Sequence, residues 1–489
     1  MSRVQNSKVF QIDDDFITLG QLLKEEGIIP TGGAAKWFLR EHQVKINGEL
    51  DNRRGKKLRP GDEIEIVGIE SVKIESKQWS QMILQELHLK NFRNYDDLQV
   101  TFSPGINILI GENAQGKTNL LEAIHVLALT KSHRTSKDRE LIQWKQKQAF
   151  LSGKVQKKVE RVPLEIQIAQ GAKRVKVNHL YQTRLSSYVG NLNVVLFAPE
   201  DLALVKGAPQ IRRQFMNMEF GQMSSAYLYN VSHYHSLLQQ RNQYLKQLRS
   251  GEQTDRVLLG VISDQLAQFG AAIVVARFKL LKQLEHWAQQ LHEHISLQKE
   301  QLQLKYVTQL TIDDQTPVEE LQQQLRQLYD DNIDREIALG TTMAGPQRDD
   351  IHFIVNGQNV QHFGSQGQQR TTALAVKLAE IDLMKEQTGE YPLLLLDDVL
   401  SELDDDRQTH LLTAIQDKVQ TFLTTTSLSG VARKLIHQPT IFQINGGTLT
   451  KEETTWAIKN VKRKQSKPKK RRKKRLNWEA NTTRARFRF

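Results

Sequence analysis

Residues 106–127 read INILIGENAQGKTNLLEAIHVL, and they decide the fold of the longest part of the chain. A short apolar run at 106–110 precedes a glycine-containing loop, and apolar residues recur at helical spacing behind it. Strand, G-x-x-x-x-G-K-T loop and helix in this order form a phosphate-binding P-loop. The loop residues that we predict to bind ATP are Gly111, Glu112, Asn113, Ala114, Gln115, Gly116, Lys117 and Thr118.

Each residue type in this loop has a physical role. Glycines let consecutive backbone N–H groups point at phosphate oxygens, and the N-terminus of the following helix adds a favourable dipole. We expect Lys117 to reach the β- and γ-phosphates and the Thr118 hydroxyl to bind Mg²⁺.

Four leucines at 393–396 lead directly into Asp397 and Asp398. An apolar strand that ends in carboxylates is typical of a Walker B strand, where an Asp holds Mg²⁺ opposite the P-loop hydroxyl. We therefore predict that Asp397 and Thr118 bind Mg²⁺, and that Asp398 orients or deprotonates the attacking water. If residues 393–398 are considered alone, an ordinary buried strand with a polar end is the alternative to a Walker B strand.

Ser365, Gln366, Gly367 and Gln368 precede a helical pattern, and the stretch SELD at 401–404 follows the two aspartates. These stretches resemble the signature and the D-loop of ATP-cassette enzymes. In that architecture the signature of one subunit contacts the γ-phosphate held by the P-loop of another. The resemblance therefore implies an ATP-dependent homodimer with two composite sites, in which Ser365 completes the catalytic set. An ordinary amphipathic helix with a serine cap is the alternative.

The net charge of +13 is concentrated at one end of the chain. Residues 459–489 hold fifteen Lys and Arg and one acid, so the rest of the chain carries a net charge of −1. A segment this basic with few apolar residues buries too little surface to fold, so we predict that it is disordered and attracts nucleic acid. Cysteine is absent, which excludes disulfides and Cys-bound metals, and no apolar run approaches the length of a membrane span.

Residues 17–67, about fifty in number, indicate a separate small unit. Two short helical patterns are followed by the alternating strands 44–48 and 63–66, with a basic loop between them. This order resembles the S4-type RNA-binding fold, and more closely the small YaaA-type proteins. The resemblance implies that structured RNA contacts a set of cations, for which a solvated charged loop is the alternative. These are Lys36, Arg40, Arg53, Arg54, Lys56, Lys57 and Arg59.

These patterns together predict an α/β P-loop ATPase of the ATP-cassette (SMC/Rad50-like) class with a small α+β unit ahead of it. We expect a frayed end before residue 13, an S4-like domain at 13–70, a polar linker at 71–81 and the ATPase at 82–455. A helical lobe is expected at about 206–328, and the basic tail at 456–489.

Several stretches resemble the RecF family, the ATP-cassette recombination mediators of bacterial gap repair. They are HLKNFRNY at 88–95, the P-loop, KSHRT at 131–135, residues 197–202, GPQRDD at 345–350, the signature and residues 396–404. The resemblance runs from about Gln81 to Asn445. It implies ATP-dependent dimerisation on duplex DNA near single-strand junctions and slow DNA-stimulated hydrolysis. It also implies cooperation with RecR and RecO in loading RecA, the SOS response, and a cytoplasmic, nucleoid-associated protein.

Other classes fit the sequence less well. An SMC or RecN protein needs hundreds of coiled-coil residues between P-loop and signature, whereas here the gap is about 250 residues and contains strands. A transporter ATPase keeps a switch histidine after the strand that here ends in Thr424-Thr425-Thr426, and no histidine follows that strand in this chain. Thr426 is therefore a candidate γ-phosphate sensor. A single-cassette RNA- or ribosome-associated ATPase is the remaining alternative, because of the S4-like unit and the tail.

Overall fold

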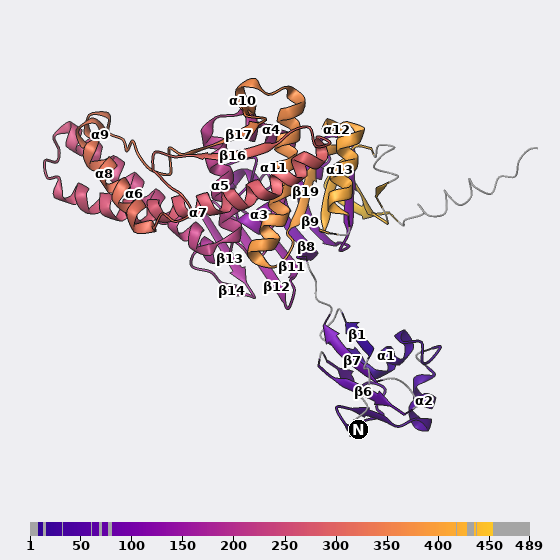
Figure 1. The fold of residues 1–489 in the computed structure, drawn as a ribbon. Helices are drawn as coiled ribbons and strands as arrows, with labels where there is room; N and C mark the ends of the chain where they lie inside the picture. Colours follow the sequence, from indigo (N-terminus) through magenta and orange to yellow (C-terminus); the bar gives the residue numbers. More distant parts are fainter. Residues whose placement is uncertain are drawn as a thin grey trace, which may run out of the picture.

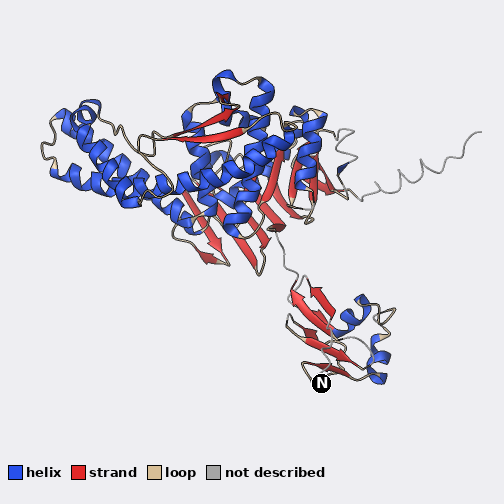
Figure 2. Cartoon of the chain, in the orientation of Figure 1, coloured by secondary structure: helices blue, strands red, loops and turns tan. Residues whose placement is uncertain are grey.

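The computed structural model describes residues 8–12, 16–31, 33–59, 61–67, 71–76, 81–416, 418–427, 435–436 and 438–452 (Figures 1 and 2). The predicted basic tail at 456–489 lies outside the described residues.

The N-terminal unit is a small α+β fold with a five-stranded sheet in the order β1-β7-β6-β3-β4. Leucines and isoleucines from α1, β3 and β6 form its core, and Leu19 and Ile64 are fully buried there. Its elements are β1 (Lys8–Ile12), β2 (Ile17–Thr18), α1 (Leu19–Glu25), α2 (Ala35–Glu41), β3 (Val44–Ile46), β4 (Glu49–Leu50), β5 (Lys57–Leu58), β6 (Glu63–Ile66) and β7 (Val72–Ser76).

Two expectations for the edges of this unit were wrong. Part of the predicted linker is strand β7, and part of the predicted frayed end is strand β1, which pairs with β7 in parallel. Val72 and Ile74 are buried on either side of exposed Lys73, so this segment has the alternation of a half-buried strand. The pattern spans only three residues between polar neighbours, so the sequence predicted a linker there.

The nucleotide-binding motifs lie on a six-stranded sheet in the order β15-β19-β20-β10-β21-β22, with all pairs parallel except the last. Because one strand separates β10 from β19, the P-loop and the two aspartates meet at the carboxyl edge on either side of β20. The strands are β10 (Ile106–Ile110), β15 (Val194–Phe197), β19 (Leu393–Asp397), β20 (Thr421–Thr425), β21 (Thr440–Asn445) and β22 (Thr448–Lys451).

A second six-stranded sheet is antiparallel, in the order β14-β13-β12-β11-β8-β9. Helix α3 (Lys117–Leu129) shares one apolar core with both sheets, and eleven of its residues are buried. A helix that is apolar on nearly every side fits such a position between two sheets. The strands are β8 (Ile83–Phe92), β9 (Tyr95–Thr101), β11 (Gln148–Gln156), β12 (Arg161–Ala169), β13 (Ala172–Val177) and β14 (Leu180–Tyr181).

Helices α11 (Gln366–Thr388) and α13 (Asp405–Ile415) share a separate core with the parallel sheet. Leu374 and Leu378 of α11 and Leu411 of α13 pack there with the apolar strand residues Ile108 and Leu394. Short α12 (Val399–Glu402) follows β19 and leads into α13. The predicted signature thus opens a long core helix.

Long helices form an arm that leaves the body of the ATPase (Figure 1). It continues past the predicted end at 328, and a strand, β16, interrupts the helical pattern. The arm is built from α6 (Ser225–Ser250), α7 (Val257–Ile295), α8 (Val318–Asp331) and α9 (Ile333–Leu339), of which α7 also runs into the body. Helices α4 (Leu202–Lys206), α5 (Pro209–Met223) and α10 (Val360–Phe363) lie over the body. The strands of the adjoining sheet are β16 (Leu302–Val307), β17 (Asp350–Val355) and β18 (Gln358–Asn359).

Helix α7 corrects one expectation from the sequence. By length and composition alone it contains a stretch apolar enough to cross a membrane, of mean hydropathy 1.6. In the structure 44 % of this stretch is buried, and Leu266, Val274 and Leu281 of α7 pack in a core to which α6, α8 and α11 also contribute. The apolar composition of α7 therefore serves packing between helices.

Candidate nucleotide-binding site

The P-loop curls around a glycine whose backbone no other residue would adopt easily. Gly116 has φ of 118° and precedes the first residue of α3. The Tyr95 hydroxyl donates to the Gly116 carbonyl at 2.9 Å, and a Cβ on Gly116 would lie 2.7 Å from Asn94 Nδ2. Both the positive φ and the crowding therefore require glycine here.

Lys117 lies over the loop that it belongs to. Its Nζ donates to the carbonyls of Gly111 at 2.5 Å and Glu112 at 2.9 Å, and the residue is buried. Burial lowers the pKa of the Lys117 ammonium, while the charges of Asp398 and Asp397 act in the opposite direction. The next residue, Thr118, is hydrogen-bonded to Asp397 at 3.0 Å, so Lys117 lies in the same site as the end of β19.

Two hydroxyls contact the same carboxylate oxygen of Asp397. Thr118 Oγ1 donates to Asp397 Oδ1 at 3.0 Å, and Thr424 Oγ1 donates to it at 2.7 Å. A carboxylate beside a threonine hydroxyl at the N-terminus of a P-loop helix is a donor set that Mg²⁺ prefers, so these residues fit the predicted metal. Sequence reasoning missed Thr424 and favoured Thr426, which is exposed and has no hydrogen bond to either aspartate in the described chain.

Asp398 adopts a left-handed backbone, with φ of 53°. Its N–H donates to Thr424 Oγ1 at 2.8 Å, and its carbonyl accepts from Ser401 Oγ at 2.7 Å. A non-glycine residue in this region is held by its surroundings, and such residues concentrate at functional sites. Thr424 thus fixes both aspartates at once.

The predicted signature residues lie at the exposed N-terminus of α11. Ser365 accepts from Gln368 N at 3.2 Å, and Ser365 N donates to Gln368 Oε1 at 2.9 Å, which is a capping box. Gln368 also donates to Glu300 at 2.9 Å. Within the described chain, these residues form no hydrogen bond with the P-loop, Asp397 or Asp398. The structure gathers Lys117, Thr118 and the two aspartates, and leaves the signature facing solvent.

A turn between β8 and β9 supports the P-loop from outside. Asn94 Nδ2 donates to Gln115 O at 3.1 Å, and Gly447 N donates to the same carbonyl at 3.1 Å. Gly447 has φ of 82°, and a Cβ there would lie 2.3 Å from the Asn94 carbonyl. The stretch HLKNFRNY therefore has a direct structural role at the nucleotide loop, which the sequence alone did not specify.

Glu122 of α3 ties two distant loops to the P-loop helix. It is fully buried and accepts from Arg93 at 2.6 and 2.8 Å and from Ser132 Oγ at 2.6 Å, with Arg134 at 3.4 Å. Burial acts to raise the pKa of the Glu122 carboxyl, but these donors outweigh it and lower the pKa. Sequence reasoning missed Glu122, because nothing in the pattern of an apolar helix shows which loops its single acid contacts.

A buried ion cluster holds the signature helix against α5. Lys377 donates to Glu380 at 2.8 Å and lies 3.6 Å from Glu219. Burial acts to lower the pKa of Lys377, but Glu380 and Glu219 reverse this and raise it. Gln222 links the cluster to the sheet, since it donates to Glu219 at 2.8 Å and to Val194 O at 3.0 Å. Breaking such a pair is costly, so α11 is fixed relative to the sheet.

The predicted RNA-binding cations of the N-terminal unit are exposed or half-buried, but they are not equivalent. Arg53 donates to Asp51 at 2.7 and 2.9 Å, and Lys56 lies 3.4 Å from the same carboxylate. The Arg53 hydrogen bonds lower the pKa of the Asp51 carboxyl despite opposing desolvation. Lys57 lies over the Phe16 ring at 4.0 Å. One acid therefore offsets part of the positive charge of this loop.

Lys36 and Arg40 lie on α2 beside Trp37, which is 67 % exposed. The Arg40 guanidinium lies 5.6 Å from the centre of the Trp37 ring. Arg54 covers Gly20 of α1, and Arg59 is exposed at the end of β5. The unit thus presents cations from two elements, together with one exposed aromatic ring.

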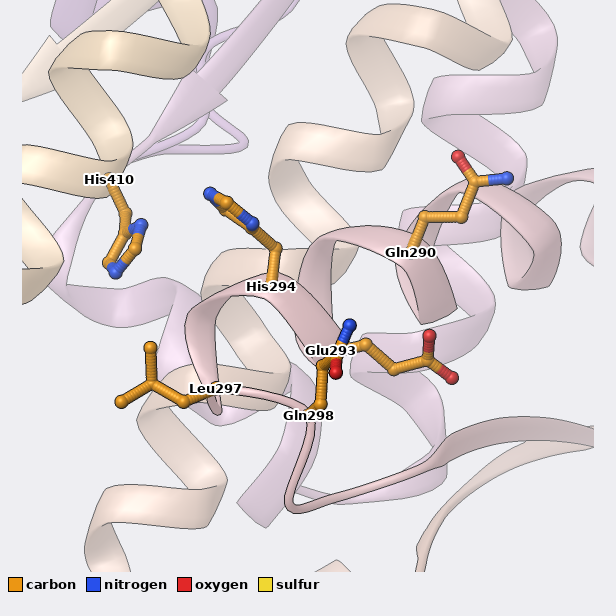
Figure 3. Close-up of a pocket in the computed structure, with 6 residues that line it drawn as sticks. All are labelled: Gln290, Glu293, His294, Leu297, Gln298 and His410. Atoms are coloured by element: carbon orange, nitrogen blue, oxygen red, sulfur yellow. The ribbon is translucent and has the colours of Figure 1, made fainter.

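A surface pocket lies away from this chemistry, between the end of α7 and α13 (Figure 3). The rings of His294 and His410 are 5.1 Å apart there, and the Glu293 carboxylate points away from them. No group of three or more metal-binding side chains occurs among the residues that the structure describes. None of the pocket residues belongs to the nucleotide-binding motifs.

Comparison with protein families divides the chain in the same place as the fold. The S4 domain family matches residues 10–75. The family described as RecF/RecN/SMC N terminal domain matches residues 83–450, which hold every nucleotide-binding motif.

Individual proteins resemble the second part at high identity. DNA replication and repair protein RecF of Limosilactobacillus fermentum is 74 % identical over 372 residues, which are 76 % of this chain and 100 % of that protein. The protein of the same name from Enterococcus faecalis is 56 % identical over 375 residues, again 76 % and 100 %.

Solved structures agree in fold. The recombination mediator protein RecF-ATPrS in the RecFOR pathway superposes with a TM-score of 0.72 at 31 % identity. It covers 77 % of this chain and 100 % of its own. The same mediator with ATP gives a TM-score of 0.71.

Proposed function

Because the chain belongs to the RecF family of DNA replication and repair proteins, we propose that it is an ATP-dependent DNA-binding protein of recombinational repair. We propose that ATP drives two copies to dimerise on DNA at gap junctions, and that slow DNA-stimulated hydrolysis ends this state. With RecO- and RecR-type partners the dimer promotes RecA loading onto single strands and the SOS response, in the cytoplasm at the nucleoid.

The proposal that ATP drives dimerisation rests on one observation. Lys117, Thr118 and Asp397 meet at one edge of the sheet, whereas Ser365 is exposed and bonds only within its own helical turn. A γ-phosphate at the P-loop of one chain would therefore meet donors on only one side. The N-terminus of α11 from a second chain supplies the missing donors and a favourable dipole.

The residues at the carboxyl edge of the parallel sheet have different roles in the proposed ATP hydrolysis. Lys117 and the N–H groups of 111–118 bind the phosphates, while Thr118 and Asp397 would hold Mg²⁺, whose charge would offset that of the phosphates. Asp398 orients the attacking water, and Thr424 fixes its backbone through the 2.8 Å hydrogen bond.

Sedimentation of the full chain with ATP and gapped DNA tests this proposal. We expect a monomer without nucleotide and a DNA-bound dimer with ATP, and Asp398→Asn should prolong the dimer because a positioned base contributes about 10²- to 10⁴-fold in rate. Ser365→Arg should stay monomeric while still binding ATP. A monomer that hydrolyses ATP at the wild-type rate would refute the scheme.

We also propose that the S4 domain binds structured RNA. Exposed Trp37 lies beside Arg40 and can stack on a base, and Arg54 and Arg59 add exposed cations to the same unit. In the full chain, changing Arg54 and Arg59 to Ala should weaken hairpin RNA binding and leave ATP-dependent DNA binding intact. Loss of both activities together would instead favour a single RNA- or ribosome-associated ATPase.

A further inference from the structure

One tryptophan of the ATPase is almost completely exposed. Trp144 is 92 % exposed, although tryptophan usually buries most of its large surface. It lies in a tight turn closed by the hydrogen bond from Gln146 N to Gln143 O at 3.1 Å. Lys145, the next residue, has φ of 67°. The Trp144 side chain is therefore exposed on a hydrogen-bonded turn at 143–146.

The base of this turn is fixed to the sheet. Gln143 N donates to Asn91 O at 2.9 Å, Ile142 forms a bridge with Phe92, and the Gln143 side chain donates to Asp96. The turn is anchored next to the Asn94 and Tyr95 contacts with the P-loop. The turn that carries Trp144 is therefore held beside the β8–β9 turn, whose Asn94 contacts the nucleotide loop.

The sequence on both sides of Trp144 is rich in cations, of which Arg134 and Lys137 are ion-paired with Glu122 and Glu140. Residues 131–147 contain six Lys and Arg and two acids, in a chain whose charge outside the tail is −1. One of the acids, Asp138, is already bonded to Lys173 at 2.8 Å. Arg139, Lys145 and Lys147 are exposed, and none of them forms an ion pair within the described chain. The six cations are Lys131, Arg134, Lys137, Arg139, Lys145 and Lys147.

We propose that Trp144 stacks on an unpaired base at the junction between single- and double-stranded DNA, while cations of 131–147 hold the adjacent phosphates. The inference rests on the proposed function and names the residue that reads the junction. Phosphates are present along duplex and single strand alike, but a base face is free only where it leaves the duplex. Trp144 therefore supplies preference for the junction, and the cations supply general affinity.

Binding of the full chain with ATP to gapped DNA and to blunt duplex of equal length tests the inference. Trp144→Ala should weaken binding to gapped DNA by about 5- to 150-fold, the range expected for one base–aromatic stack. Binding to blunt duplex should stay within about 2-fold, because phosphate contacts are unchanged. Trp144→Phe should retain most of the preference. A 2-aminopurine at the first unpaired position should be quenched by the wild type and not by Trp144→Ala.

Tyr181→Ala is the matched control. Tyr181 is also an exposed aromatic beside a cation, with Lys176 at 4.9 Å, but it lies on edge strand β14, whereas the Trp144 turn is anchored to β8, four strands away in the same sheet. It should leave the junction preference unchanged. If Trp144→Ala binds gapped DNA as tightly as the wild type does, the inference fails while the proposed function stands. If the wild type does not bind DNA with ATP, the proposed function itself fails.

Discussion

Replacing Glu122 by Gln removes the charge that holds three segments together. The side chain is fully buried and faces the Arg93 guanidinium, which is itself only 19 % exposed. Gln keeps the shape but turns one acceptor oxygen into a donor, so one of the two Arg93 hydrogen bonds is lost whichever way the amide faces. Arg93 is left partly buried without a counter-charge.

The expected cost follows from the burial of both partners. Removing one member of a buried ion pair costs roughly 3–5 kcal/mol, and the partial exposure of Arg93 favours the lower end, about 3 kcal/mol. Glu86→Gln is the matched control, because Glu86 of β8 forms an exposed ion pair with Lys154 of β11 at 2.8 Å. Their side chains are 49 % and 58 % exposed. Exposed pairs contribute about 0–1 kcal/mol.

Urea unfolding of the full chain, followed by far-ultraviolet circular dichroism with and without ATP, measures both variants. The pKa of Glu122 is lowered in the fold, so its stabilisation is present above the unfolded pKa and is lost as pH falls through the folded pKa. The difference between wild type and Glu122→Gln should therefore persist at neutral pH and shrink in acid below about 4.5. Equal and small losses in the Glu122 and Glu86 variants would refute the clamp.

Further changes test the nucleotide site and the tail. Gly116→Ala should abolish ATP binding, measured by fluorescent-nucleotide titration, because its Cβ would meet Asn94 at 2.7 Å in a backbone with φ of 118°; near-normal affinity would contradict this geometry. Asp397→Asn should weaken Mg²⁺-dependent ATP binding while Asp398→Asn preserves it, and equal losses in calorimetry would contradict the division of roles. Removing 459–489 should reduce the slope of log affinity for duplex against log salt concentration by about four to five, if about five tail cations engage phosphates. An unchanged slope would exclude phosphate contacts by the tail.

The sequence predicted those parts of the fold that local pattern determines. Apolar runs before Gly111 and Asp397 identified the two central strands, and both lie in the parallel sheet as expected. The helical lobe expected at about 206–328 contains the long helices α6 and α7. The family resemblance, which depends on short motifs in order, is confirmed by relatives that are 74 % and 56 % identical.

Contacts between distant segments could not be predicted in this way. Thr424 looks like its neighbours Thr425 and Thr426, and only the register of β20 with β19 places its hydroxyl on Asp397. Glu122 is one acid in an apolar helix, and its partners come from two other loops. Trp144 is exposed because of a turn whose anchor, Asn91, lies on another strand.

The composite site is the central claim, and mixing two inactive variants tests it most directly. Lys117→Ala disables the P-loop, and Ser365→Arg disables the signature, so each alone should hydrolyse almost no ATP on gapped DNA. A mixed dimer pairs the intact P-loop of one chain with the intact signature of the other. Neither variant should dimerise with itself, so an equal mixture should recover up to about half of wild-type activity, since each mixed dimer has one of its two sites working. If the mixture stays as inactive as the separate variants, signature and P-loop do not act between chains.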